Sequence, residues 1–383
     1  MTTTIDNEQK TLNVPNLRFP EFEGEWEENY VNEICNEFKS GKAIKADLIL
    51  DVGTYPVFGG NGLRGYTSTY NHDGLFVLIG RQGALCGNVR SVIGKTYITE
   101  HAIAVNGNNK SDTNFLHYLF LQMDLGRFSD QSAQPGLAVN KLLKLKVITP
   151  RIDEQRKIAN LLRLLDERIA TQNKIIEDLK KLKSAIIEVH YKQCEKHNIQ
   201  VADLGDPFNA GNLSKEDLSE TGTRCILYGE LFTTYGEIIN EVINHTNTLK
   251  GMTLSKKGDL LFPSSTTVDA ISLIAPSVIN VDNVVLGGDM FGIHIDSNYN
   301  AQYLSYYFNH IAKRLLAKYA KGSTIIHLHY KDIEQAELLL PNLDEQNRMA
   351  NCLMLLDDKI GIETAFLNLQ ICKKNYLLRQ MFI

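Results

Sequence analysis

The chain has 383 residues, of which 43% are apolar and 22% charged, a composition that excludes a mainly disordered protein and predicts two or three folded domains. No apolar run approaches the ~18 residues that a membrane span needs, and the N-terminus lacks a basic segment followed by an apolar core, so we expect a cytoplasmic protein without membrane contact. Six scattered cysteines without a Cys-x-x-Cys pair argue against a structural zinc site or a disulfide framework.

The net charge of −5 is unevenly distributed along the chain. Residues 42–149 carry a net charge of +4, whereas residues 201–340 carry −6. Because local charge matters more than the total for binding a polyanion, the first region permits nucleic-acid binding and the second does not favour it.

An internal repeat organises the chain. Residues 150–166 recur without a gap as residues 341–357, 191 positions later, and more than half of the aligned positions are identical. A fainter match relates residues 31–41 to residues 201–211 at an offset of 170. A period this long that occurs twice indicates a domain duplication. We expect an N-terminal segment (1–24), a first globular domain (25–149), a first helical spacer (150–197), a second globular domain (198–340) and a second helical spacer (341–383).

Each repeated segment has the pattern of a long helix. Pro150 marks a boundary, Asp153 suits the N-cap, and apolar residues then recur every three or four positions to about residue 195. The pattern predicts a coiled-coil seam through which the two helices pair. An alternative is that the two helices are unrelated and pack on their own domains. The residues expected to pair the helices are Ile158, Leu161, Leu165, Ile175, Leu179, Leu182, Ile186, Leu353, Leu356, Ile360 and Leu367.

The segments before the two helices have a mixed α+β pattern. The first is expected to contain strands at 55–59, 74–80, 95–99 and 101–105 and a helix at 115–122. The second is expected to contain strands at 258–262, 270–274, 284–286 and 290–295 and a helix at 301–318. Tyr303, Tyr306 and Tyr307 in this last helix are expected to be core residues.

Motifs for catalysis and metal binding are missing from the sequence. Gly94-Lys95-Thr96 lacks the earlier glycine of a phosphate-binding loop, and no Gly-x-Ser-x-Gly elbow is present. His327 and His329 have no further ligand at metal-binding spacing. We therefore expect a non-catalytic binding and scaffolding protein without a catalytic residue, a metal or a cofactor of its own.

Two halves joined by helical arms, each opening with Pro-x-x-x-Glu-Gln, resemble the specificity (S) subunit of a Type I restriction-modification system. The segment 14–22 followed by Glu25-Trp26 is similar to the start of many such subunits, and the stretches 55–62 and 79–87 are similar to one class of target recognition domain. The duplicated helix motif is the specific part of this resemblance.

The resemblance implies an α+β fold with two mixed α/β target recognition domains joined by long helices that form an antiparallel coiled coil. It implies binding to double-stranded DNA at a bipartite target, one half-site per domain. Two modification (methyltransferase) subunits and two restriction (translocase and nuclease) subunits would assemble on the chain. S-adenosylmethionine, ATP and Mg²⁺ are expected on those partner subunits.

Candidate DNA-binding residues are polar side chains beside glycine turns, where a backbone can approach DNA. Arginine pairs bidentately with guanine, asparagine and glutamine pair with adenine, and lysine contacts phosphate. In the first domain the candidates are Asn61, Arg64, Arg81 and Gln82, with Lys45 and Lys95 for phosphate. In the second they are Tyr228, Thr234, Tyr235, Ser264, Ser265, Thr266 and Thr267, with Lys256, Lys257, Lys318 and Lys321 for phosphate.

Two other functions fit the same pattern. One is a stand-alone sequence-specific DNA-binding regulator, and the other is a coiled-coil assembly protein without a DNA role. A stoichiometric methyltransferase partner favours the specificity subunit, whereas DNA binding by the chain alone at physiological salt favours the regulator.

Overall fold

The computed structural model describes residues 12–129 and 136–383, so the first eleven residues of the expected N-terminal segment lie outside it. The chain forms two compact units: unit 1 contains residues 1–173 and 365–383, and unit 2 contains residues 174–364. Within the described ranges, no helix combines the length and apolar character that crossing a membrane requires.

Unit 1 contains a four-stranded antiparallel sheet in the order β2-β8-β5-β6 and a three-stranded sheet in the order β4-β3-β7. A separate antiparallel pair, β1 with β9, joins the start of the domain to the strand before the first long helix. The strands are β1 (Glu27–Tyr30), β2 (Cys35–Ser40), β3 (Tyr55–Gly59), β4 (Gly62–Thr67), β5 (Leu75–Gly80), β6 (Val89–Ile93), β7 (Tyr97–Ile98), β8 (Ala102–Gly107) and β9 (Lys146–Thr149).

The helix α2 (Thr113–Gln122) lies against this four-stranded sheet, and its N-cap Asp112 accepts a hydrogen bond from the backbone N–H of Phe115 at 3.1 Å. Trp26, Phe115 and Phe120 anchor the hydrophobic core of unit 1. The shorter helices are α1 (Val31–Ile34), η1 (Ala46–Leu48), η2 (Leu125–Phe128) and α3 (Val139–Leu142).

Unit 2 contains two five-stranded sheets, in the orders β11-β21-β17-β19-β14 and β12-β15-β13-β20-β16. Two strand pairs, β10 with β23 and β18 with β22, complete it. The strands are β10 (His197–Gln200), β11 (Gly205–Asn209), β12 (Leu218–Ser219), β13 (Thr223–Leu227), β14 (Ile238–Ile239), β15 (His245–Thr246), β16 (Thr253–Leu254), β17 (Asp259–Pro263), β18 (Ser265–Thr266), β19 (Ser277–Ile279), β20 (Val285–Gly287), β21 (Met290–Ile295), β22 (Ile326–His327) and β23 (Glu337–Leu340).

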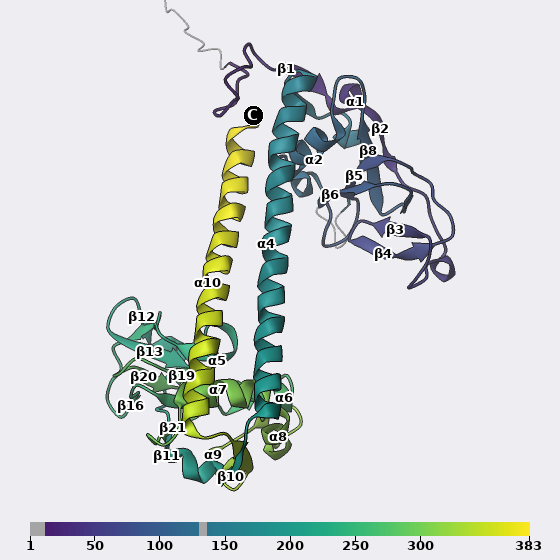
Figure 1. The fold of residues 1–383 in the computed structure, drawn as a ribbon. Coiled ribbons are helices and arrows are strands. Elements are labelled where there is room, and N and C mark those ends of the chain that lie inside the picture. The colour runs from purple at the N-terminus through teal and green to yellow at the C-terminus, as the bar shows by residue number, and fades with distance from the viewer. Residues whose placement is uncertain (1–11, 130–135) are drawn as a thin grey trace, which may run out of the picture. The chain divides into compact units, whose positions relative to one another are not determined.

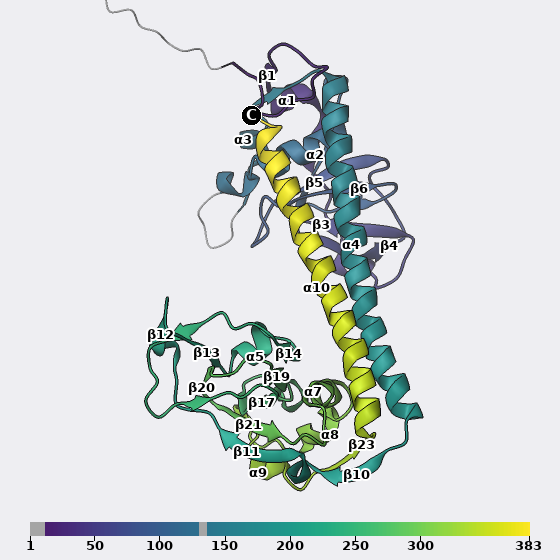
Figure 2. The same ribbon diagram turned by 60° about the vertical axis from the view of Figure 1, so that its left-hand side comes forward.

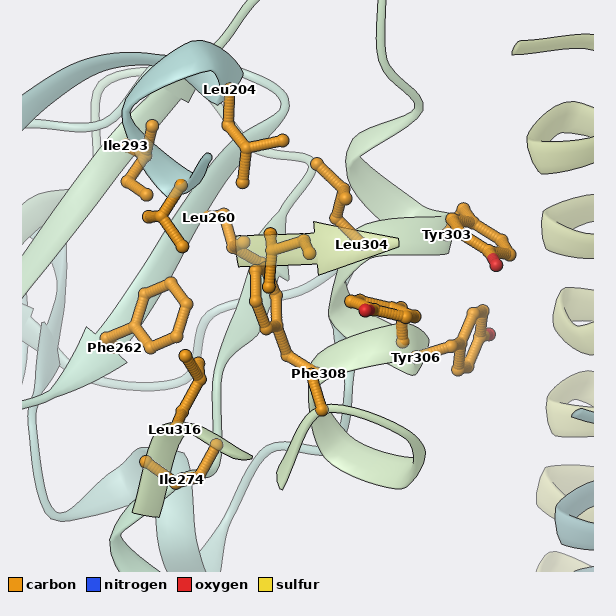
Figure 3. Close-up of a cluster of buried hydrophobic side chains, with 14 of the residues drawn as sticks. Leu204, Leu260, Phe262, Ile274, Ile293, Tyr303, Leu304, Tyr306, Phe308 and Leu316 are labelled. Carbon is orange, nitrogen blue, oxygen red and sulfur yellow. The ribbon is translucent and has the colours of Figure 1, made fainter. Parts of the chain in front are cut away.

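The largest core of unit 2 packs β17, β21 and the helix α7 (Ala301–His310) into one apolar cluster that includes Leu260, Phe262 and Leu304 (Figure 3). In this cluster Phe262 stacks on Phe291. Tyr303, Tyr306 and Tyr307 are buried at the edge of this cluster, which confirms their expected core position. The short helices of unit 2 are η3 (Val201–Leu204), η4 (Lys215–Asp217), α5 (Glu230–Thr233), α6 (Ala270–Leu273), α8 (Lys313–Leu316), η5 (Ala317–Tyr319) and α9 (Tyr330–Ile333).

The two expected long helices are present as α4 (Ile152–Gln193) and α10 (Leu343–Gln380). Each unit contains a segment of both helices, and in each unit the two segments run antiparallel (Figure 1, Figure 2). In unit 2, for example, Lys183 pairs with Asp357 while the later residue His190 pairs with the earlier residue Glu345. The expected antiparallel coiled coil is confirmed.

The glutamine of each Pro-x-x-x-Glu-Gln motif anchors a long helix to a recognition domain. Gln155 Nε2 donates to the carbonyl of Pro150 at 2.8 Å, and its Oε1 accepts from the backbone N–H of the α2 cap residue Asp112 at 2.9 Å. Gln346 makes the same two bonds, to the carbonyl of Pro341 and from the backbone N–H of the α7 cap residue Asn300. The repeated sequence therefore builds the same joint twice.

The fainter repeat is also structural. Glu27 to Tyr30 pair with Thr149 to Lys146, and His197 to Gln200 pair with Leu340 to Glu337. The first strands of these pairs are 170 residues apart and the second strands 191, which are the two offsets found in the sequence. Both recognition domains consequently begin and end with the same kind of antiparallel strand pair.

Two expected secondary-structure elements are corrected. In place of the strand expected at 270–274, Ala270–Leu273 form the helix α6, because Asp269 accepts from the backbone N–H of Ser272 at 2.7 Å and so caps a helical turn. The expected helix 301–318 is interrupted at Ile311 and Ala312, whose backbone N–H groups both point to the carbonyl of Tyr307.

Candidate nucleic-acid interface

In unit 1, two glycine turns lie against each other and gather candidate residues. The turn between β3 and β4 contains Gly60, where a Cβ would lie 2.7 Å from the carbonyl oxygen of His101 and 3.3 Å from the Cα of Gly80. Only glycine fits this close approach of two backbones. The backbone N–H of Arg81 donates to the same His101 carbonyl at 2.9 Å. Asn61, Arg81 and Gln82 therefore lie on two turns whose backbones are in contact.

Three arginines surround these turns. Arg64 packs over Gly59, and Arg90 of β6 covers Gly62, where a Cβ would lie 2.3 Å from Nη1 of Arg90. In the part of the chain that the structure describes, no carboxylate forms an ion pair with Arg64, Arg81 or Arg90. The buried Nε of Arg90 also lacks a hydrogen-bond partner among the described residues. Arginines that lie around two turns without a carboxylate partner of their own among the described residues form a site suited to a polyanion. We call Asn61, Arg64, Arg81, Gln82 and Arg90 the turn cluster.

Arg90 and His101 were not predicted from the sequence. Arg90 is separated from the glycine turns in sequence and reaches them through the pairing of β6 with β5. His101 Nδ1 lies 3.1 Å from Oε1 of Gln82 and orients that side-chain amide. Neither position has a local sequence signal that distinguishes it from an ordinary strand or loop residue.

The two candidate lysines of unit 1 lie at other turns. Lys45 is exposed directly before η1. Lys95 lies in the turn between β6 and β7, with its ammonium 4.9 Å from the centre of the Tyr70 ring. Their assignment to phosphate stays a prediction.

In unit 2, several candidates line a hollow of about 440 Å³. Tyr228 lies beside Gly288, where a Cβ would be 2.8 Å from the tyrosine ring. The pairing of β18 with β22 supplies the opposite wall. The lining consists of the predicted residues Tyr228, Ser265, Thr266 and Thr267 together with Gly229, Phe232, Asp289, Ile325 and His327, which the sequence analysis did not single out. We call this feature the unit 2 hollow.

The other candidates of unit 2 have different surroundings. Ser264 is 2% exposed, which corrects its expected role as a direct DNA contact. The hydroxyl of Tyr235 accepts from the backbone N–H of Ile243 at 3.2 Å and so holds a loop, whereas Thr234 is exposed at the end of α5. Lys321 Nζ pairs with Asp332 at 2.5 Å, so its charge is compensated. Lys256, Lys257 and Lys318 are exposed.

The buried seam of α4 is offset from the expected one. Its members are the buried or half-buried residues Ile158, Leu162, Leu165, Ile169, Gln172, Ile176, Leu179 and Lys183. Ile158 and Leu165 are buried as expected, while Leu161, Leu179 and Ile186 are half-buried. Ile175 and Leu182, which are 40% and 49% exposed, lie outside the seam and correct the prediction. On α10, Leu353 is buried, and Leu356, Ile360 and Leu367 are half-buried.

Among the residues that the structure describes, no three His, Cys, Asp or Glu side chains are arranged to hold a metal ion.

Comparisons with known proteins agree with this architecture. The model of the Type I restriction modification DNA specificity domain matches the chain twice, at residues 23–181 and 197–371. The chain is 39% identical over 186 residues to the Type I restriction enzyme EcoprrI specificity subunit of Escherichia coli, a match that spans 46% of this chain and 45% of that protein. It is 24% identical over 353 residues to a putative Type I restriction enzyme specificity subunit of Haemophilus influenzae, covering 86% of this chain and 87% of that protein.

Solved structures show the same fold. The S subunit of the Type I restriction-modification system of M. genitalium superimposes with a TM-score of 0.66 at 17% identity, covering 97% of this chain and 99% of that chain. A chain from a study of complex assembly and conformational transition of the Type I system superimposes with a TM-score of 0.55 at 14% identity, covering 93% and 97%.

Two recognition domains, two long helices and two matches to one family model define the class of protein. The chain belongs to the family of Type I restriction-modification specificity subunits. Members of this family are generally non-catalytic.

Proposed function

We propose that this chain binds double-stranded DNA at a bipartite target, and that each recognition domain reads one half-site. The turn cluster supports this proposal most directly, because its three arginines have no carboxylate partner among the described residues. Arginine is the residue that most often reads guanine in the major groove, and it also pairs with phosphate. The chain's own residues contribute binding and orientation.

We also propose that the long helices carry the partner subunits. In unit 2, Leu355 and Ile362 of α10 are 70% and 65% exposed, seven residues apart on the same face. In unit 1, Leu369 and Tyr376 continue this spacing on α10 and are 66% and 59% exposed. Apolar side chains that recur every seven residues on a helix form a second face onto which another helix can pack.

The partners that this family assignment implies are two modification subunits with S-adenosylmethionine and two restriction subunits with ATP and Mg²⁺. Methyl transfer and cleavage would be carried out by those subunits, and this chain would select the DNA.

The test is to map methylated adenines in host DNA with and without the gene for this chain. The proposal expects one bipartite motif, two short specified halves around an unspecified spacer, that disappears when the gene is removed. Co-purification with untagged partners tests whether the chain assembles with a methyltransferase subunit. Tight DNA binding by the chain alone, without a stoichiometric methyltransferase subunit and without a dependent motif, would contradict the proposal and favour a stand-alone regulator.

A further inference from the structure

Two ion pairs connect the long helices at equivalent positions of the repeat. Asp166 and Asp357 are 191 residues apart, and so are Lys183 and Lys374. In unit 1, Lys374 Nζ donates to Asp166 Oδ1 at 2.5 Å. In unit 2, Lys183 Nζ donates to Asp357 Oδ1 at 2.7 Å. Each pair therefore takes its carboxylate from one copy of the helix and its ammonium from the other.

A tyrosine from each recognition domain completes both pairs. Tyr118 of α2 donates its hydroxyl to Asp166 Oδ2 at 2.9 Å, and Tyr306 of α7 donates to Asp357 Oδ2 at 2.6 Å. In each case the ammonium of the paired lysine also lies over the tyrosine ring, 5.8 Å from its centre in unit 1 and 4.6 Å in unit 2. We call each group a Lys–Asp–Tyr triad.

The tyrosines and lysines of the triads are sheltered from solvent, whereas the side chains of Asp166 and Asp357 are 34% and 33% exposed. Tyr118 is 3% exposed and Tyr306 is fully buried. The side chains of Lys183 and Lys374 are 7% and 19% exposed. Burial, together with the hydrogen bond to its aspartate, raises the pKa of each tyrosine above its ordinary range, so both hydroxyls remain donors. A largely buried lysine ammonium needs its carboxylate partner, because an unpaired buried charge is strongly destabilising.

An apolar seam alone does not determine which residues face each other. Sliding one helix past the other by seven residues, about 10 Å, again brings aliphatic residues into contact. Such a shift would place Ala350 or Thr364 where Lys183 now meets Asp357. A buried polar pair therefore penalises the shifted arrangement and selects one register.

We propose that the two Lys–Asp–Tyr triads are register locks that position each recognition domain on the helix pair. One carboxylate binds a residue of the recognition helix and a residue of the opposite long helix at the same point. The register of the two long helices and the docking of the recognition helix are thus set together. The aspartates, lysines and tyrosines act as positioning residues, and their effect on DNA selection rests on the proposed function.

The lock of unit 1 depends more strongly on a single carboxylate. In unit 2, Lys183 also lies 3.3 Å from Glu237, which in turn is 3.0 Å from His310. In unit 1, Lys374 has Asp166 as its only carboxylate partner among the described residues. The sharper test is therefore in unit 1.

The first measurement is thermal unfolding of the full-length chain. We expect Asp166→Lys and Lys374→Asp each to lower the unfolding midpoint by several degrees, and the double variant to recover more than half of the loss. The control is the exposed pair Arg163–Glu167 on the same helix, whose charge reversals should leave the midpoint nearly unchanged. Additive losses in the double variant, or single losses no larger than those of the control, would overturn the lock.

The second measurement separates positioning from general stability. In a strain carrying Asp166→Asn, we expect methylation at additional sites whose half-sites are unchanged but whose spacer differs in length. A uniform decline at all wild-type sites would show that Asp166 only stabilises the fold, and would overturn the positioning role. If the wild-type motif does not depend on this chain at all, the proposed function fails, and the unfolding rescue still decides the lock.

Discussion

The two units hold the start of their long helices with the same glutamine but treat the neighbouring glutamate differently. In unit 1, Glu154 is 2% exposed, receives two hydrogen bonds of 2.8 Å from Arg18, and lies 3.3 Å from the indole nitrogen of Trp26. In unit 2, the side chain of Glu345 is 29% exposed and meets His190 at 3.2 Å. The glutamine thus joins the long helix to the domain in both units, whereas the partners and the burial of the neighbouring glutamate differ between the units.

The candidate DNA-binding surfaces differ in the same way. The turn cluster of unit 1 contains three arginines without an ion-pair partner among the described residues, and residues 42–149 carry a net charge of +4. The unit 2 hollow is lined by aromatic and hydroxyl side chains within a segment of net charge −6. The same scaffold can therefore carry two surfaces of different chemistry, because the hydrogen bonds of Gln155 and Gln346 involve none of the residues that line these surfaces.

The largest effect is expected when a charge enters the buried seam. Leu162 and Leu353 are equivalent in the repeat, and both are fully buried. Leu162→Asp or Leu353→Asp should destabilise the chain by at least about 3 kcal/mol, because a carboxylate would lose its hydration without gaining a partner. The measurement is chemical unfolding of the purified chain.

The repeat supplies matched controls for that experiment. Leu164 and Leu355 are also equivalent leucines, but they are 49% and 70% exposed. Leu164→Asp and Leu355→Asp should change the free energy of unfolding by less than about 0.5 kcal/mol. Equal losses at buried and exposed positions would contradict the seam described above.

A smaller effect should separate the two glutamates. Arg18→Met leaves the buried carboxylate of Glu154 without its cation. This variant should lower the free energy of unfolding by roughly 2–3 kcal/mol, because removing one partner of a buried ion pair leaves the other charge buried and uncompensated. His190→Gln in unit 2 should cost less than about 1 kcal/mol, because Glu345 remains accessible to water and to Arg348. Unfolding curves of the two variants measured side by side give the comparison, and a larger loss for His190→Gln would reverse our interpretation.

The duplication, the long helices and their antiparallel pairing could be predicted from the sequence because they depend on period and identity. The seam position was harder to predict. Choosing aliphatic residues placed Ile175 and Leu182 in the seam, whereas the structure uses Ile176 and Lys183. A lysine that finds a buried carboxylate on a distant helix leaves no local signal, so the pattern of apolar residues pointed one position away.

The candidate site was predictable where backbone geometry determines it. The glycines at 59–62 and 80–83 correctly indicated two tight turns, and the structure brings these turns together. Arg90 and His327 reach their surfaces through strand pairing over a longer distance in sequence, which residue type alone does not reveal.

The pH dependence of stability should also distinguish the units. Burial lowers the pKa of His117 in unit 1 from 6.5 to about 4, with nearby Lys374 acting in the same direction and Asp166 opposing. Between those values the unfolded chain binds a proton that the folded chain does not, so His117 makes stability fall as the pH drops from about 6.5 to 4. The loss should be on the order of 1–3 kcal/mol, and His117→Gln should remove it.

Glu237 in unit 2 should act in a more acidic range. Burial alone would raise its pKa, but the hydrogen bond with His310 and the charge of Lys183 outweigh burial and bring the pKa from 4.5 to about 2. Its stabilisation is therefore present above about pH 4.5 and lost as the pH falls toward 2. The measurement is the free energy of unfolding as a function of pH for wild type and for each single variant. The difference between wild type and His117→Gln isolates the contribution of His117, and the difference between wild type and Glu237→Gln isolates that of Glu237. A Glu237→Gln difference that developed at pH 5–7 would contradict the assignment.

The last comparison concerns base recognition by the two candidate surfaces. Arg81 lies in the second glycine turn, where its backbone N–H donates to the carbonyl of His101 and its side chain has no carboxylate partner among the described residues. If it reads guanine, Arg81→Ala should cost ~1–3 kcal/mol of binding and relax one position of one half-site. Thr266→Ala in the unit 2 hollow should cost about 1 kcal/mol or less and affect only the other half-site, because a hydroxyl offers a single neutral hydrogen bond. Lys110→Ala, an exposed change in unit 1 away from the turn cluster, serves as the control.

Methylation mapping for each variant measures the motif, and binding to oligonucleotides altered one base at a time measures the affinity. A loss for Arg81→Ala that is equal on all sequences would assign this arginine to phosphate, because a phosphate contact positions the protein without distinguishing one base pair from another.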